Sequence, residues 1–103
     1  MRSLVRVAIP TESGNAAIRK GALQKALREF LDKWKPEAAY FYADRGKREA
    51  LFVLDLADQS QIPAMLEPLW LAMGAEVQVV PAMNLDDFTK AMPDIEAAVR
   101  DNP

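Results

Sequence analysis

The sequence of 103 residues contains neither cysteine nor histidine. Without cysteine, the chain can form no disulfide, thiolate nucleophile or cysteine metal site. Without histidine, it lacks the commonest transition-metal ligand and the usual general base near neutral pH. Zinc hydrolase sites, histidine triads and His-ligated haem are therefore excluded within this chain. Any catalysis must depend on carboxylates, Tyr, Lys, Arg, backbone groups or a bound cofactor, although we expect no metal and no cofactor.

Long apolar runs and glycine-rich loops are also missing. No run of 18 apolar residues is present, so we expect no membrane span. The first ten residues, "MRSLVRVAIP", are too short and too charged for a secretory signal, which favours a cytoplasmic protein. Four scattered glycines cannot form a phosphate-binding loop. The expectation is one soluble domain over residues 1–103.

The net charge of -2 argues against binding to nucleic acid. The charge is unevenly distributed, because residues 1–50 hold 11 Lys and Arg against 6 Asp and Glu, whereas residues 51–103 hold 2 against 9. The two halves therefore carry +5 and -7. Each half can simply present a solvated face, or the two can form complementary faces that orient subunits in an assembly.

The apolar spacing predicts four strands and three helices. Strands are expected at 3–10, 37–44, 48–56 and 75–83, and helices at 15–35, 58–74 and 84–100. Gly46 is expected to supply the positive φ of a tight hairpin, and Gly74 to close the second helix. Asp58 or Ser60 and Asn84 are expected to cap helices, while Pro93 is expected to break or kink the third.

The order β-α-β-β-α-β-α predicts a ferredoxin-like α+β sandwich with an extra C-terminal helix. Two split β-α-β units with right-handed crossovers give a four-stranded antiparallel sheet in the order 4-1-3-2, with two helices on one face. Both Trp34 and Trp70 fall on apolar helix stripes, so we expect them in the core.

The other face of this sheet is too apolar to lie in water and too polar for an ordinary core. A mixed face of this kind usually meets another subunit, and two such sheets facing each other make a dimeric α+β barrel. The alternative is a third helix that folds back over the sheet. Alternating parity assigns these residues to the face: Leu4, Arg6, Ala8, Tyr40, Tyr42, Leu51, Val53, Asp55, Glu76, Gln78 and Val80.

Segments along the chain resemble a family of small uncharacterised bacterial proteins. They are "NAAIRKG", "KPEAAYF" and "IPAMLEPLWL" followed by "AEVQVVPAM", and the similarity covers residues 5 to about 90. The resemblance implies a dimeric α+β barrel, whose larger relatives include antibiotic-biosynthesis-type monooxygenases, muconolactone-isomerase-like proteins and small stress-response proteins. It supplies no catalytic residues, and the absence of histidine departs from those members that use one.

Arg6 and Tyr40 are the candidate catalytic residues. Arg6 can hold a substrate carboxylate or enolate oxygen, or it can pair with Glu76, Gln78 or Asp55 at the dimer interface. Tyr40 and Tyr42 can act as acid or hydrogen-bond donor, or simply pack at that interface. We expect these three residues and Gln78 to surround a ligand.

A second, weaker candidate lies where the first helix is expected to begin. Asn15 and Arg19 flank that helix end, which presents free N–H groups to an anion. Arg19 could gather there with Lys47 and Arg48 around a carboxylate or phosphate, although helix caps and exposed basic residues look the same. Asp55 and Asp58 are too few acids for a metal site.

The sequence favours a homodimer that binds a small organic ligand in its barrel. Chemistry without histidine could be a cofactor-independent oxygenation or isomerisation, with Arg6 stabilising an oxyanion and Tyr40 donating a proton. One alternative is a non-catalytic oligomerisation or binding module whose barrel is packed by its own side chains. Another is an RNA-binding sheet that uses Tyr40 and Tyr42, which the net charge and the expected dimer disfavour.

Overall fold

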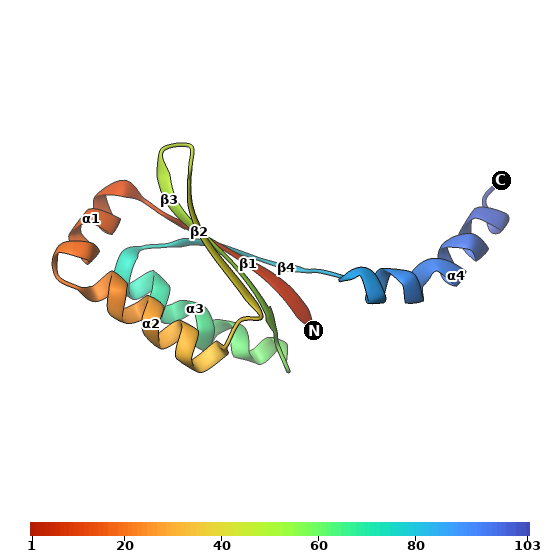
Figure 1. The fold of residues 1–103 in the computed structure, drawn as a ribbon, viewed down its shortest axis with the longest axis horizontal. Coiled ribbons are helices and arrows are strands. Elements are labelled where there is room, and N and C mark those ends of the chain that lie inside the picture. Colours follow the sequence, from red (N-terminus) through yellow and green to blue (C-terminus); the bar gives the residue numbers. More distant parts are fainter.

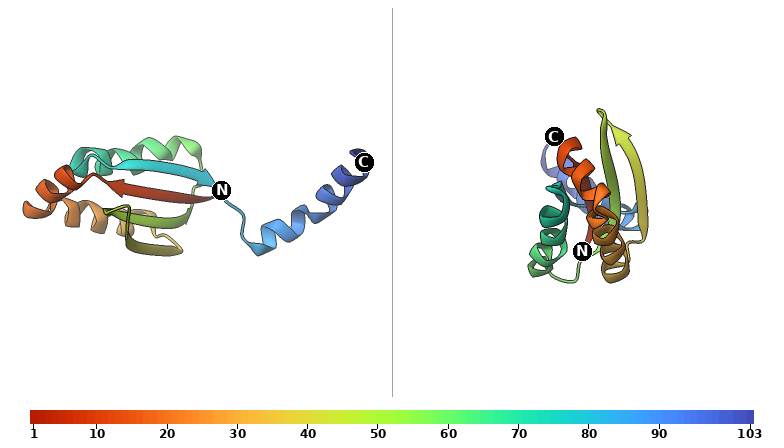
Figure 2. Two further views of the ribbon diagram at one scale, coloured as in Figure 1. Left: turned by 90° about the horizontal axis from the view of Figure 1, so that it is seen from above. Right: turned by 90° about the vertical axis from the view of Figure 1, so that its left-hand side faces the viewer.

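A computed structural model describes all 103 residues and shows an α+β fold built on one antiparallel sheet. Its four strands are β1 (Arg2–Ile9), β2 (Ala38–Asp44), β3 (Lys47–Asp55) and β4 (Glu76–Pro81). They lie in the order β2-β3-β1-β4, which read from the other edge is the predicted 4-1-3-2. Figures 1 and 2 show the two long helices, α2 and α3, on the same face of the sheet, as predicted.

The first helical region is two helices and not one. Helix α1 spans Thr11–Arg19 and α2 spans Ala22–Trp34, so the single helix expected at 15–35 is wrong. The break occurs at Gly21, whose φ of 77° is left-handed and cannot continue a right-handed helix. In addition, α1 starts at Thr11, directly after Pro10 and before the expected helix start at residue 15.

The local signals around the second crossover helix are confirmed. A short 3-10 turn, η1 (Gln59–Gln61), leads into α3 (Ile62–Met73). Asp58 and Gln61 form a capping box at its start, and Gly74 ends α3 with a left-handed φ of 59°. Within α3, Pro68 lies on the exposed side, where water can satisfy the carbonyl that its missing N–H leaves free.

The core lies between the helices and the covered face of the sheet. At its centre the rings of Phe52 and Phe30 pack at a tilt of 41°, with their centroids 4.6 Å apart. Trp70, expected in the core, is 42% exposed, because α3 turns Met65 inward in its place. The buried apolar residues are Val5, Val7, Ile9, Ala17, Leu23, Ala26, Phe30, Ala50, Phe52, Leu54, Leu56, Met65, Leu66, Leu69, Met73 and Ala75.

The last helix, α4 (Leu85–Asp101), projects away from the rest of the molecule (Figure 1). Pro93 was expected to break or kink it; the helix continues through Pro93, so the break does not occur, and the kink stays a prediction. Because of this arm, the radius of gyration is 17.1 Å, against roughly 13 Å for a compact domain of this length. No residue of α4 is buried, and the helix does not fold back over the sheet. The second sheet face is therefore left open.

Candidate functional site

The open face of the sheet brings together side chains from all four strands. In the register of the sheet, Arg6 on β1 lies between Leu51 on β3 and Gln78 on β4. One step along, Ala8 lies between Glu49 and Glu76 in the same way. These two rows place charged and amide side chains at the centre of a face that no helix covers.

A hollow of about 330 Å³ lies over these rows. The β2–β3 hairpin forms one wall, since Asp44 and Arg45 belong to the lining. In its turn, Arg45 and Gly46 adopt φ values of 53° and 74°. Two consecutive positive φ values are typical of the type I′ hairpin turn, and the predicted role of Gly46 is thereby confirmed. The lining is almost entirely polar and consists of Arg6, Ala8, Asp44, Arg45, Glu49, Glu76 and Gln78.

Arg6 and Glu49 form the centre of the hollow. The Arg6 Nε atom lies 3.9 Å from Glu49 Oε2, a distance at the long limit for an ion pair. The Glu49 side chain is only 10% exposed, whereas that of Arg6 is 52% exposed. The nearby Tyr42 side chain, together with the charge of Glu49, raises the pKa of Arg6, so it stays a cation at every ordinary pH.

Glu49 Oε2 is a buried oxygen that accepts no hydrogen bond. A buried carboxylate oxygen without a donor is unfavourable, because it has lost its hydration without replacement. The hollow therefore contains a fixed cation beside an acceptor whose hydrogen-bonding capacity is unused.

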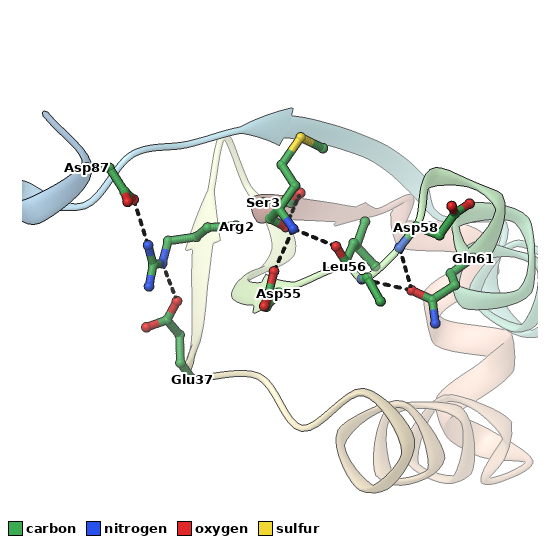
Figure 3. Close-up of polar contacts among 10 residues, drawn as sticks. Arg2, Ser3, Glu37, Asp55, Leu56, Asp58, Gln61 and Asp87 are labelled. Atoms are coloured by element: carbon green, nitrogen blue, oxygen red, sulfur yellow. Dashed lines mark hydrogen bonds and ion pairs between the residues drawn. The ribbon is translucent and has the colours of Figure 1, made fainter. Parts of the chain in front are cut away.

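Within one chain Arg6 has a partner that was not predicted, while the pairing expected across a dimer interface stays a prediction. Neither Glu76, Gln78 nor Asp55 pairs with it; its one ion pair is with Glu49. Asp55 lies at the other end of the sheet, where its carboxylate accepts a hydrogen bond of 2.6 Å from the ammonium group of Met1 (Figure 3). That ammonium group lowers the pKa of Asp55.

The two tyrosines lie beside the hollow and not in its lining. Tyr40 is in register with Leu51 and is 62% exposed. Tyr42 is in register with Glu49, half-buried, and close enough to Arg6 to affect its pKa. Of the predicted ligand residues, Arg6 and Gln78 therefore line the hollow. Tyr42 lies outside the lining, in register with Glu49.

Asn15 and Arg19 are not brought to this hollow. Because α1 begins at Thr11, Asn15 lies in its second turn, where its Oδ1 accepts a hydrogen bond of 3.0 Å from Arg48 Nη2. Arg19 is exposed in the last turn of α1. The expected position of both residues at the first helix end is therefore wrong, although Asn15 does contact Arg48.

Glu49 is the site residue that the sequence interpretation missed. It has the same strand parity as Leu51 and Val53, both assigned to the open face, so the signal was present in the alternation. Asp44 likewise shares the parity of Tyr40 and Tyr42, whereas Arg45 carries no such signal because it lies in the hairpin turn.

The structure also bears on a metal site and on a membrane-spanning helix. Asp44, Glu49 and Glu76 all line the hollow, but no three acidic side chains in the structure form a group that could hold a metal ion. No helix has both the length and the apolar character needed to cross a bilayer.

Comparison with known proteins adds no further identification. A scan against models of protein families matches none of them, and a search of curated proteins finds no match. The structure thus shows a four-stranded antiparallel α+β sheet with ferredoxin-like topology, an open face, and an extended shape that exposes large apolar side chains.

Proposed function

We propose that this chain is a homodimer that associates through the open sheet face and holds a small polar organic ligand in the hollow around Arg6. The observation that carries the proposal is the hollow itself, on a sheet face that no element of the chain covers. A second sheet placed over it turns a surface depression into an enclosed barrel interior. Enclosure strengthens each polar interaction, because it removes competing water.

The charges of the hollow indicate the chemical class of the ligand. Arg6 and Arg45 can bind an acidic oxygen, such as a carboxylate, phenolate or enolate. The hollow also holds the three carboxylates of Asp44, Glu49 and Glu76, which can accept hydrogen bonds from a hydroxyl or amine on the same molecule. A small hydroxylated or amino-bearing organic acid satisfies both sides.

If the site is catalytic, the supported chemistry is an isomerisation or a cofactor-independent oxygenation of an activated substrate. Arg6 would stabilise negative charge that develops on the substrate oxygen. The proton-donor role that the sequence assigned to Tyr40 would suit Tyr42 better, because Tyr42 is half-buried and in register with Glu49, which lines the hollow, whereas Tyr40 is 62% exposed.

The second candidate is a non-catalytic association module whose interior is filled by its own side chains. One observation favours it: Arg6 already has an acidic neighbour in Glu49, which a purely structural charge requires. The length of that contact, and the 52% exposure of the Arg6 side chain, leave the guanidinium group accessible to a ligand and favour the ligand-binding proposal.

The test is a nuclear magnetic resonance titration of the labelled full chain with salicylate, 4-hydroxybenzoate and malonate. We expect at least one acid to shift the amide signals of Arg6, Glu49 and Gln78 in a saturable way. Arg6→Gln should abolish the shift, while Arg19→Gln, which removes an exposed arginine distant from the hollow, should leave it unchanged. No saturable shift with any probe would reject the ligand and leave the association module.

A further inference from the structure

Helix α4 carries an apolar stripe that has no partner in the chain. Its large apolar side chains follow a 3-4-3-4 spacing and are all exposed: Leu85, Phe88, Met92, Ile95 and Val99. Ala91 and Ala98 widen the stripe on one side. A stripe of this width is typical of a helix that packs on a broad surface, whereas a coiled-coil seam is narrower.

The base of α4 is fixed to the sheet, so the arm has a defined point of departure. Arg2 Nη1 donates a hydrogen bond of 2.8 Å to Asp87 Oδ2, and Arg2 Nε donates one of 2.6 Å to Glu37 Oε1 (Figure 3). Asn84 and Asp87 complete a capping box, and the Ala82 amide still pairs with the Arg2 carbonyl. Only Met83 and Asn84 separate the last sheet hydrogen bond from α4.

The open sheet face carries the matching apolar surface. It carries the polar hollow at the hairpin end and, next to it, an apolar half, which stops at a charged row of Arg2 and Asp55 where β4 leads into α4. In the sheet register, Leu4 lies between Val53 and Val80. Tyr40 and Leu51 extend this group towards β2. The apolar half is thus defined as Leu4, Tyr40, Leu51, Val53 and Val80.

We infer that α4 is an exchanged arm, which packs its stripe on the apolar half of the open sheet face of a second copy of this chain. The inference rests on the proposed homodimer and specifies how it is built. Two unpartnered apolar surfaces occur in one chain whose short, tethered connection directs them apart. In a dimer, the α4 stripe of each copy can pack on the apolar half of the other copy. A two-fold axis makes the two contacts equivalent.

The dimensions agree with this exchange. A helix of 17 residues is about 25 Å long, close to the roughly 26 Å of an eight-residue strand such as β1, so an arm that packs on the apolar half also extends over neighbouring parts of the same face. With a helix diameter of about 10 Å, two arms and the two faces that receive them bury on the order of 1,000 Å². That area reaches the roughly 1,000 Å² expected of a biological interface before any sheet-to-sheet contact is added.

Cross-linking of mixed cysteine variants tests the exchange directly, because the natural chain contains no cysteine. Met92→Cys and Leu51→Cys are prepared separately, mixed, and treated with a short bifunctional thiol reagent. We expect a heterodimeric cross-link at least tenfold more abundant than in the control mixture of Lys90→Cys with Leu51→Cys. Lys90 lies on the opposite side of the same helix, and is therefore a matched control. Equal yields in the two mixtures would overturn the exchange.

A second pair of variants keeps the inference falsifiable if cross-linking geometry is poor. Ile95→Glu places a charge in the stripe, and Lys90→Glu places the same residue on the outer side. We expect Ile95→Glu to weaken dimerisation at least tenfold in sedimentation, and Lys90→Glu to change it less than threefold. A dimer unaffected by Ile95→Glu would overturn the exchanged arm and leave the proposed homodimer standing.

An intramolecular cross-link in the double variant Met92→Cys with Leu51→Cys, formed in dilute monomer, would place the arm on its own sheet and also overturn the inference. Failure of the ligand is separate from both results, because the acid probes report on the hollow and the cross-links report on the arm. A positive heterodimeric cross-link without acid binding supports the exchange and rejects only the ligand.

Discussion

Arg6 and Glu49 face each other on neighbouring strands, yet the guanidinium Nε and the carboxylate Oε2 remain 3.9 Å apart. That carboxylate oxygen is buried and accepts no hydrogen bond. A site optimised only for stability would close this contact or replace it with apolar side chains, because a buried unsatisfied charge is costly. This long contact between Arg6 and Glu49 is therefore the feature that most distinguishes the hollow from an ordinary sheet surface.

Glu49→Gln should stabilise the isolated fold. The amide has the same shape and avoids the burial of an unsatisfied charge, so we expect the free energy of unfolding to rise by about 1 kcal/mol. Urea unfolding of the variant measures it, with Glu76→Gln as the exposed control that should change little. A loss of 1 kcal/mol or more in Glu49→Gln would show that the Arg6 pair is strong and would favour the association module.

The start of α3 should depend on pH through Asp58. Hydrogen bonds from the Ser60 side chain and amide lower the pKa of Asp58 in the folded protein. A lowered folded pKa stabilises the fold above the unfolded pKa, and this contribution is lost as the pH falls through the folded value. Asp58→Ala should thus lower the melting temperature at pH 7, and the difference from the natural chain should shrink below about pH 4. Asp58→Asn, which retains the capping oxygen, should abolish the pH dependence while keeping part of the stability.

The break between α1 and α2 should be sensitive to side chains at Gly21. A Cβ there meets no atom within 4 Å, but the φ of 77° is unfavourable for a residue with a side chain. Gly21→Ala should lower the free energy of unfolding by about 1 kcal/mol, and Gly21→Asn by less. Urea unfolding measures both. Unchanged or increased stability in Gly21→Ala would mean that the chain continues through this position as a single helix.

Arg2 should control how the arm leaves the sheet. Arg2→Gln removes the charge that joins Glu37 to Asp87, while leaving the Ala82 backbone hydrogen bond in place. We expect amide exchange at Asp87 and Phe88 to accelerate several-fold, with the core amides of β1 unaffected. Arg100→Gln, near the free end of α4, is the control and should have no effect on these amides. Equal exchange in both variants would show that Arg2 does not fix the arm.

Local chemistry made much of the fold predictable from sequence. Gly46, Asp58, Gly74 and Asn84 each act through a backbone geometry or a hydrogen bond within a few residues, and each has the predicted role. The break at Gly21 was hidden because the apolar spacing continues through it from Ile18 to Leu23. Apolar periodicity predicts which side chains face the core. It does not predict that a single residue such as Gly21 adopts a positive φ and ends a helix.

The site and the arm were harder to predict for a different reason. Strand parity placed Arg6 and Gln78 on one face, but the depth of the hollow comes from the curvature of the hairpin, which alternation does not encode. The stripe on α4 showed that one side of the helix is apolar and can pack on another apolar surface. It did not show whether that partner lies in the same chain, because an amphipathic pattern is the same for either packing.

Sedimentation equilibrium of the natural chain at micromolar concentration tests the central proposal most directly. The account predicts a species with twice the mass of the chain, because the open sheet face and the α4 stripe are both unpartnered in one copy. A single species with the mass of one chain over the whole concentration range would contradict both the homodimer and the exchanged arm.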